Sequence, residues 1–115
     1  MDYYRELYEA TAWLLMLCAQ MKEYPFSTVV SRYLEESGAD SRKCAVESAA
    51  VLLALDRNGE PMPAEVIDRL ERNIAGLRAD EFSESVRADV EADLKTAKNV
   101  IAWYRTAKGQ LKQGS

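Results

Sequence analysis

Two stretches of this chain contain no polar side chain, and they constrain the fold more than any other feature. Residues 12–19 read Ala-Trp-Leu-Leu-Met-Leu-Cys-Ala, and residues 49–55 read Ala-Ala-Val-Leu-Leu-Ala-Leu. A helix that is apolar on every side is usually buried on every side. We therefore expect two nearly encircled helices, the first and the third along the chain, to form the centre of the core.

The rest of the chain predicts further helices around these two. Its 115 residues are enough for one domain with a core that needs no disulfide or metal. Apolar residues recur at helical spacing, and no strand-like alternation runs for more than a few residues. The expected helices cover residues 2–23, 28–36, 42–56, 63–78 and 84–108. The sequence thus predicts an all-α fold, a compact bundle of four to five helices in a single domain over residues 1–109, with a frayed tail over 110–115.

Local signals predict where these helices begin and end. Short polar side chains accept hydrogen bonds from the unpaired N–H groups at a helix start, and glycine adopts the left-handed conformation that ends many helices. The expected N-caps are Ser27, then Asp40 or Ser41, and Ser83. Gly38 and Gly109 are the expected stops, and Pro63 is the expected first residue of the fourth helix.

The absence of histidine restricts the chemistry that the chain can carry out. Histidine is the commonest general base and the commonest metal ligand. Cys18 and Cys44 cannot complete a tetrahedral zinc site by themselves, and we expect both to be buried as small apolar residues. No glycine-rich phosphate-binding loop is present. The sequence therefore indicates a protein that is not an enzyme and that holds no cofactor or metal.

Charge and hydropathy point to the cytoplasm. The chain is acidic, with a net charge of −4 and a pI of about 4.9. This charge disfavours non-specific binding to nucleic acid or to anionic membranes. The apolar run at 12–19 is also much shorter than the roughly 20 residues of a membrane-spanning helix.

The last predicted helix is polarised in charge. Acidic residues dominate from Ala79 to Asp93, whereas every charged residue from Leu94 onward is basic. Dipole complementarity explains this pattern, because acids suit the start of a helix and bases suit its end. The alternative is head-to-tail pairing of two copies of this helix in a homodimer. The residues expected to mediate such self-association are Asp89, Asp93, Lys95 and Lys98.

Aromatic residues gather near the two ends of the chain. One explanation is that the first and last helices pack together and that these aromatic residues close the core. The other is a surface for a partner protein, since tyrosine, tryptophan and arginine are the commonest hot-spot residues. The expected partner-binding residues are Tyr4, Arg5, Tyr8, Trp103 and Arg105.

Residues 28–56 also have the outline of a helix-turn-helix, which would make the chain a DNA-binding transcriptional regulator. Arg42 and Lys43 would then reach a DNA groove. Details of the segment disagree with this alternative. Glu47 stands where a buried apolar residue is usual, and Leu34 stands where a small one is usual. Acidic residues at 35, 36 and 40 would face phosphates.

Two minor alternatives involve small ligands. The carboxylates of Glu81, Glu84, Asp89 and Asp93 could hold a divalent cation, although no second helix offers a matching pair. Met16, Met21 and Met62 could line a pocket, although methionine is more often core filler. The interpretation that we favour is a non-enzymatic protein-protein interaction module, that is, an adaptor, an assembly factor or an inhibitor of a partner protein.

Overall fold

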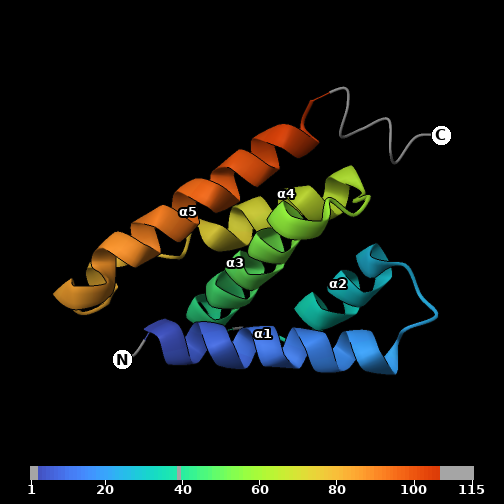
Figure 1. The fold of residues 1–115 in the computed structure, drawn as a ribbon, viewed down its shortest axis with the longest axis horizontal. Helices are drawn as coiled ribbons and strands as arrows, with labels where there is room; N and C mark the ends of the chain where they lie inside the picture. Colours follow the sequence, from blue (N-terminus) through green and yellow to red (C-terminus); the bar gives the residue numbers. More distant parts are fainter. Residues whose placement is uncertain (1–2, 39, 107–115) are drawn as a thin grey trace.

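The computed structural model describes residues 3–38 and 40–106, and these residues form an all-α bundle, as the sequence predicts. Figure 1 shows the arrangement of the helices in the bundle. The described residues contain no strand. The helices are α1 (Tyr3–Gln20), α2 (Phe26–Glu35), α3 (Ser41–Asn58), α4 (Ala64–Ile74) and α5 (Glu84–Tyr104), with a short 3-10 helix (Ala79–Glu81) before α5.

Helix α3 is the centre of the bundle, which confirms half of the prediction about the core. It lies between α1 on one side and α4 and α5 on the other (Figure 1). Every residue from Ala45 to Leu52 is buried, because neighbouring helices cover α3 on several sides. Ala45, Ala49 and Ala50 line this segment, where their small side chains let the neighbouring helices approach closely.

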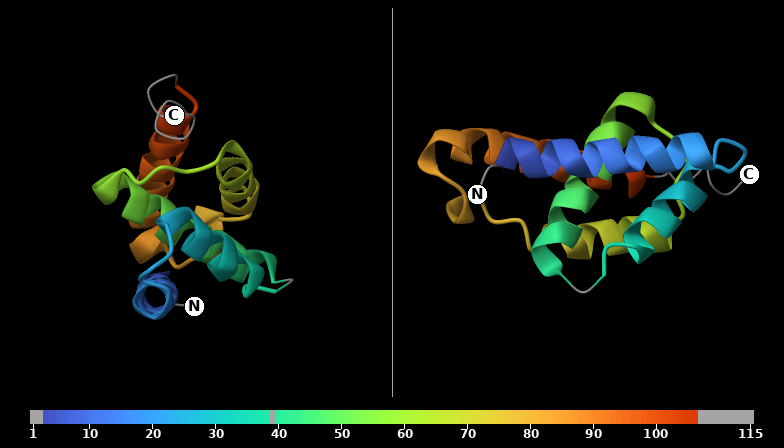
Figure 2. Two further views of the ribbon diagram at one scale, coloured as in Figure 1. Left: turned by 90° about the vertical axis from the view of Figure 1, so that its right-hand side faces the viewer. Right: turned by 90° about the horizontal axis from the view of Figure 1, so that it is seen from below.

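The expectation that the first helix is equally encircled is wrong. On α1 only Tyr3, Ala10, Leu14 and Leu17 are buried. This helix lies at the edge of the bundle and contacts α2 and α3 along one side (Figure 1). The right-hand view of Figure 2 shows α1 crossing the front of the molecule with no helix over it. The apolar residues on its outer side therefore remain exposed.

The starts of the helices agree with the sequence signals in part. The Asp40 carboxylate accepts hydrogen bonds of 3.0 Å from the N–H groups of Arg42 and Lys43, so Asp40 caps α3 as expected. Ser27 is not a cap, because α2 begins earlier, where the Pro25 carbonyl accepts the first N–H groups. Pro63 occupies the N-cap position of α4, one residue before the expected one.

The ends of the helices also differ in places. Gly38 has a φ of 73°, the expected left-handed conformation, and Gly59 caps α3 in the same way with a φ of 61°. Helix α4 ends at Ile74, earlier than expected, and α5 ends at Tyr104. Gly109 and the expected tail lie outside the described residues.

The two cysteines are partly buried and are not joined by a disulfide. The expectation that both thiols are fully buried is therefore wrong. Burial raises the pKa of the Cys18 thiol above its ordinary value. Within the described part of the chain, no helix is long and apolar enough to span a membrane.

Candidate functional site

The outer side of α1 carries large apolar side chains that the bundle does not cover. Tyr8 is 75% exposed and Leu15 is 63% exposed, and Tyr4 and Met16 are each 52% exposed. At 100° per residue, these positions fall on the side of α1 opposite its buried stripe. We call this surface the outward face of α1, and it consists of Tyr4, Tyr8, Ala12, Leu15, Met16 and Ala19. Single exposed apolar residues are ordinary, whereas a contiguous set of this kind makes the face a candidate binding surface.

Contacts at several points hold α1 against the bundle. The buried Tyr33 hydroxyl of α2 donates a 2.7 Å hydrogen bond to the Ala10 carbonyl. The Glu6 carboxylate accepts two hydrogen bonds from the Arg42 guanidinium, at 3.1 and 2.9 Å. The Tyr3 hydroxyl donates to Asp93 on α5 at 2.6 Å. The outward face is thus presented by a helix that is fixed on its inner side.

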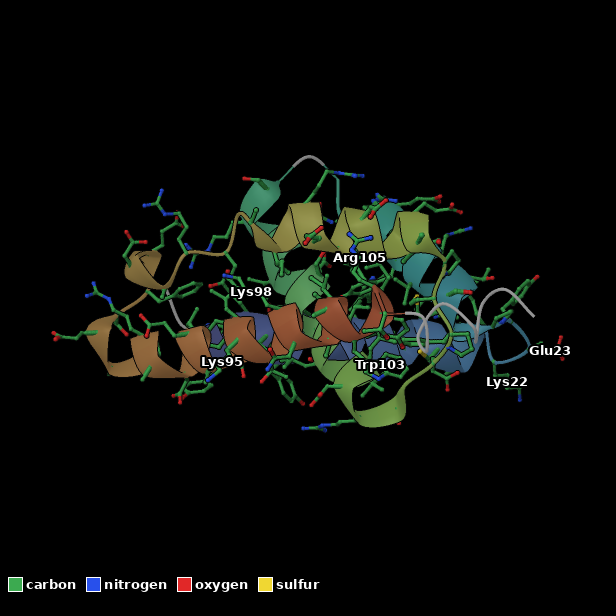
Figure 3. All side chains as sticks on the ribbon, turned by 90° about the horizontal axis from the view of Figure 1, so that it is seen from above. Lys22, Glu23, Lys95, Lys98, Trp103 and Arg105 are labelled. Atoms are coloured by element: carbon green, nitrogen blue, oxygen red, sulfur yellow. The ribbon has the colours of Figure 1, made fainter. Side chains whose placement is uncertain are left out.

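The predicted partner-binding residues fall into two separate places. Tyr4, Arg5 and Tyr8 are exposed on the first half of α1, where the Tyr4 hydroxyl donates a hydrogen bond to Asp89 near the start of α5. Trp103 and Arg105 lie at the other end of α5 (Figure 3). At about 1.5 Å per residue, the distance along α5 from Asp89 to Trp103 is about 21 Å. The structure therefore does not bring these two groups together.

The contacts of Trp103 and Arg105 tie the end of α5 to the bundle. The Arg105 guanidinium forms ion pairs with Asp68 at 2.6 Å and with Glu71 at 2.8 Å, both on α4. Trp103 is partly buried and packs edge-on against Tyr104, with ring centroids 4.8 Å apart. At this end of the molecule the ion pairs join α5 to α4, whereas the hydrogen bonds that join the first helix to the last come from Tyr3 and Tyr4 at the opposite end of α5.

The residues predicted to mediate self-association lie on different sides of α5. Asp89 and Asp93 accept hydrogen bonds from tyrosines of α1. Lys98 lines a cavity shared with α4, and Lys95, three residues earlier, is exposed on the same side of α5, away from the two aspartates (Figure 3). Head-to-tail pairing through all four residues would therefore have to use more than one side of the helix.

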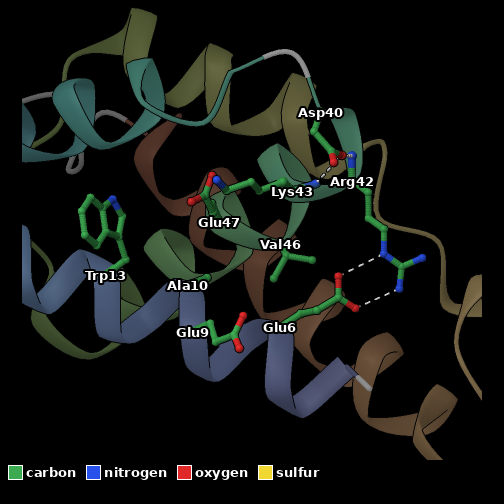
Figure 4. Close-up of a pocket in the computed structure, with 9 residues that line it drawn as sticks. All are labelled: Glu6, Glu9, Ala10, Trp13, Asp40, Arg42, Lys43, Val46 and Glu47. Carbon is green, nitrogen blue, oxygen red and sulfur yellow. Dashed lines mark hydrogen bonds and ion pairs between the residues drawn. The ribbon is translucent and has the colours of Figure 1, made fainter. Parts of the chain in front are cut away.

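A cleft of about 550 Å³ lies beside the outward face, between α1 and α3 (Figure 4). Glu6, Glu9, Ala10 and Trp13 line it from α1, and Asp40, Arg42, Lys43, Val46 and Glu47 line it from the start of α3. This cleft was not predicted from the sequence. An acid at position 47, within a segment that is otherwise small or apolar, was the one available signal.

Glu47 is the unusual residue of this cleft. Glu47 is only 5% exposed, and the Oε1 atom of its carboxyl group has no hydrogen-bond partner. Burial raises the pKa of the Glu47 carboxyl, while a hydrogen bond from Ser37 and the charge of Lys43 oppose that rise. A buried carboxyl oxygen without a donor is rare in folded proteins, because it loses its hydration without compensation.

The residues proposed for DNA binding are occupied within the molecule. Arg42 pairs with Glu6 and with Glu81, and its guanidinium stacks over the Phe82 ring at 4.4 Å from the centroid. Lys43 lines the cleft. Contact between Arg42 and a phosphate or a base would require breaking these interactions, so the helix-turn-helix alternative gains no support from the geometry.

The alternatives that involve small ligands gain no support either. Among residues 3–38 and 40–106, no group of three or more potential ligand side chains is placed to hold a metal ion. Three of the four expected carboxylates are engaged elsewhere: Glu81 pairs with Arg42, and Asp89 and Asp93 accept hydrogen bonds from tyrosine hydroxyls. The three methionines have different surroundings, since Met16 is exposed, Met21 is partly buried and Met62 lies in the core.

Comparison of the chain with protein-family models, with curated proteins and with solved structures found no match. The function therefore has to be inferred from the outward face of α1 and from the cleft beside it.

Proposed function

We propose that this protein is a non-enzymatic interaction module that binds another protein through the outward face of α1. The observation that carries the proposal is the exposure of Tyr8, Leu15 and Met16 on a helix fixed along its inner side. Burying such side chains against a partner contributes about 25 cal/mol per Å² of apolar surface removed from water. The Tyr4 hydroxyl, at one end of this face, and the neighbouring Arg5 supply the polar contacts typical of an interface rim.

The proposal covers an adaptor, an assembly factor or an inhibitor, because each of these acts by occupying a surface of its partner. The expected cytoplasmic location belongs to the same proposal, and cell fractionation would test it. The partner could be a second copy of the chain, so the experiment also has to detect a homodimer. The Asp89, Asp93, Lys95 and Lys98 surface of α5 provides the competing location for such self-association.

The test is a capture experiment that compares three matched variants. Leu15→Glu places a charge in the centre of the outward face. Ala92→Glu places the same charge at an exposed position of α5, away from that face. Lys95→Glu combined with Lys98→Glu reverses the basic end of the α5 surface. Each variant is used as bait in cell lysate, and the bound proteins are quantified, while light scattering measures the mass of each purified variant.

The expected result is a stoichiometric partner, or a dimer, that Leu15→Glu abolishes and that Ala92→Glu retains. If only the double lysine variant loses the partner or the dimer, the interface lies on α5, and the proposal for α1 is contradicted. A monomeric protein that captures the same proteins as Leu15→Glu would also overturn it. Circular dichroism of every variant checks that the bundle is intact.

A further inference from the structure

We propose that the cleft between α1 and α3 binds one positively charged group, an alkylammonium or a guanidinium, between the indole of Trp13 and the carboxyl of Glu47. This proposal adds a ligand class to the proposed protein-binding function. It rests on that function only for the source of the cation. A basic side chain of the bound partner is one carrier of such a group, and a free organic cation is the other.

The unpartnered oxygen of Glu47 is the first argument. Glu47 is buried at the boundary between the cleft and the core, and its Oε1 lacks a donor. An N–H group from a bound cation would supply that donor and compensate the buried charge at the same time. Hydrogen bonds to a charged group are also stronger than those between neutral groups.

The charge of the lining is the second argument. Its acids are Glu6, Glu9, Asp40 and Glu47, and its bases are Arg42 and Lys43. The Glu6 charge is balanced by the bidentate Arg42, and Asp40 is engaged at the start of α3. Glu9 pairs with the exposed Arg5 at 3.4 Å. The balance therefore favours a cation, because a hollow lined with excess negative charge concentrates positive ligands.

Trp13 is the third argument. Trp13 is 42% exposed, and its indole stands at the side of the cleft next to Glu47 (Figure 4). Tryptophan is the best aromatic partner for a cation, which it attracts through the face of the ring. The cleft volume of about 550 Å³ also falls within the range of about 300–1,000 Å³ that is usual for small-ligand sites.

Lys43 is the competitor within the chain. Its side chain runs toward the Glu47 carboxyl from one turn earlier in α3 (Figure 4). If Lys43 satisfied Glu47 by itself in solution, no added cation would be needed. Replacing Lys43 by methionine removes this competitor, so our proposal predicts tighter binding of an added cation to Lys43→Met than to the wild type.

The experiment is an NMR titration of the ¹⁵N-labelled protein with three probes. N-acetylarginine amide and n-butylammonium chloride carry the charge, and N-acetylcitrulline amide is the neutral isostere of the first. We expect both cations to shift the signals of cleft residues and of the Trp13 indole in a saturable manner. We expect the citrulline probe to leave these signals in place. The absence of saturable shifts with both cations would overturn the proposal.

Matched variants locate the binding site. Glu47→Gln keeps the shape of the side chain and removes the charge, and Trp13→Ala removes the aromatic wall at an exposed position. Each should weaken binding by about tenfold or more, which corresponds to about 1.4 kcal/mol. Glu65→Gln removes an exposed carboxylate on α4 and should change nothing. Equal affinity of the wild type and Glu47→Gln would contradict the proposal, and thermal melts confirm that each variant is folded.

The two sources of the cation are separated by the captured partner. Weaker capture by both Glu47→Gln and Trp13→Ala would assign the cation to a lysine or arginine of the partner, whereas unchanged capture would assign it to a free small molecule. Cation binding without any captured partner would refute the proposed function and leave the cleft proposal standing. If a partner is captured but the cleft responds to neither cation, the cleft proposal is refuted and the proposed function stands.

Discussion

The hydroxyl of Tyr3 donates a 2.6 Å hydrogen bond to the carboxylate of Asp93, and this bond joins the first helix of the chain to the last. Tyr3 has no exposed surface, and its ring packs edge-on against Phe82 with centroids 5.2 Å apart. The next residue, Tyr4, donates to Asp89 one turn earlier on α5. The start of α1 is therefore anchored on Asp89 and Asp93, two of the four residues expected to mediate self-association.

Tyr3→Phe should destabilise the protein by about 1–3 kcal/mol, because it leaves the Asp93 carboxylate without its donor while the ring stays in place. The control is Tyr4→Phe, whose exposed partner can bind water instead, and we expect a loss of about 0.5 kcal/mol or less. Urea denaturation of both variants measures the difference. Equal losses of stability in the two variants would show that the buried Tyr3 hydrogen bond contributes no more than the exposed Tyr4 bond.

Alkaline pH should unfold the protein through its buried tyrosines. Burial, followed by the hydrogen bond and charge of Asp93, raises the pKa of Tyr3 well above 10.0, and burial with the charge of Glu47 does the same for Tyr33. Burial and the charge of Glu60 raise the pKa of Tyr104 to about 12. The folded state therefore holds these protons more tightly than the unfolded state.

The stability that these tyrosines contribute is fully present below pH 10, and it falls as the pH rises from 10 toward their folded pKa values. Absorbance at alkaline pH, recorded together with circular dichroism, should show their ionisation coinciding with the loss of helix. Ionisation of Tyr104 near pH 10 in the folded protein would contradict this prediction.

Leu14 and Leu15 are neighbours on α1 with opposite environments, at 2% and 63% exposure. Leu14→Ala should cost about 2–5 kcal/mol because it leaves a cavity in the core. Leu15→Ala should change the stability by about 0.5 kcal/mol or less, because the side chain is mostly in water already. Thermal or urea unfolding of the two variants checks the orientation of α1, and a large loss with Leu15→Ala would show that the helix is turned differently.

Replacing Glu47 by methionine should raise the stability at neutral pH by about 1 kcal/mol, because it removes a buried oxygen that lacks a donor. Burial raises the pKa of this carboxyl above 4.5, so ionising it costs more in the folded state than in the unfolded state. The cost is absent well below pH 4.5, where both states are protonated; it develops as the pH rises from 4.5 toward the folded pKa and is complete above it. Urea unfolding across this pH range should show the advantage of the variant growing with pH, and an advantage that does not vary with pH would refute this explanation.

Much of the fold follows from local signals in the sequence. The helical spacing of apolar residues and the cap at Asp40 act within one or two turns, so they can be recognised without knowledge of the neighbours. The apolar run at residues 49–55 likewise indicates that α3 favours burial. These features depend on the chain alone, because they reflect the preferences of short segments.

Tyr4 and Tyr8 of the outward face were expected from the sequence, but the position of α1 and the cleft depended on the tertiary structure. Residues 12–19 are as apolar as the centre of α3, yet Leu15 is exposed because the other helices cover only one side of α1. The cleft arises where Trp13 and Glu47, which are far apart in the sequence, come to line the same space. An apolar side chain favours burial, and this preference can be read from the sequence. Whether it is buried depends on whether the other helices pack against it.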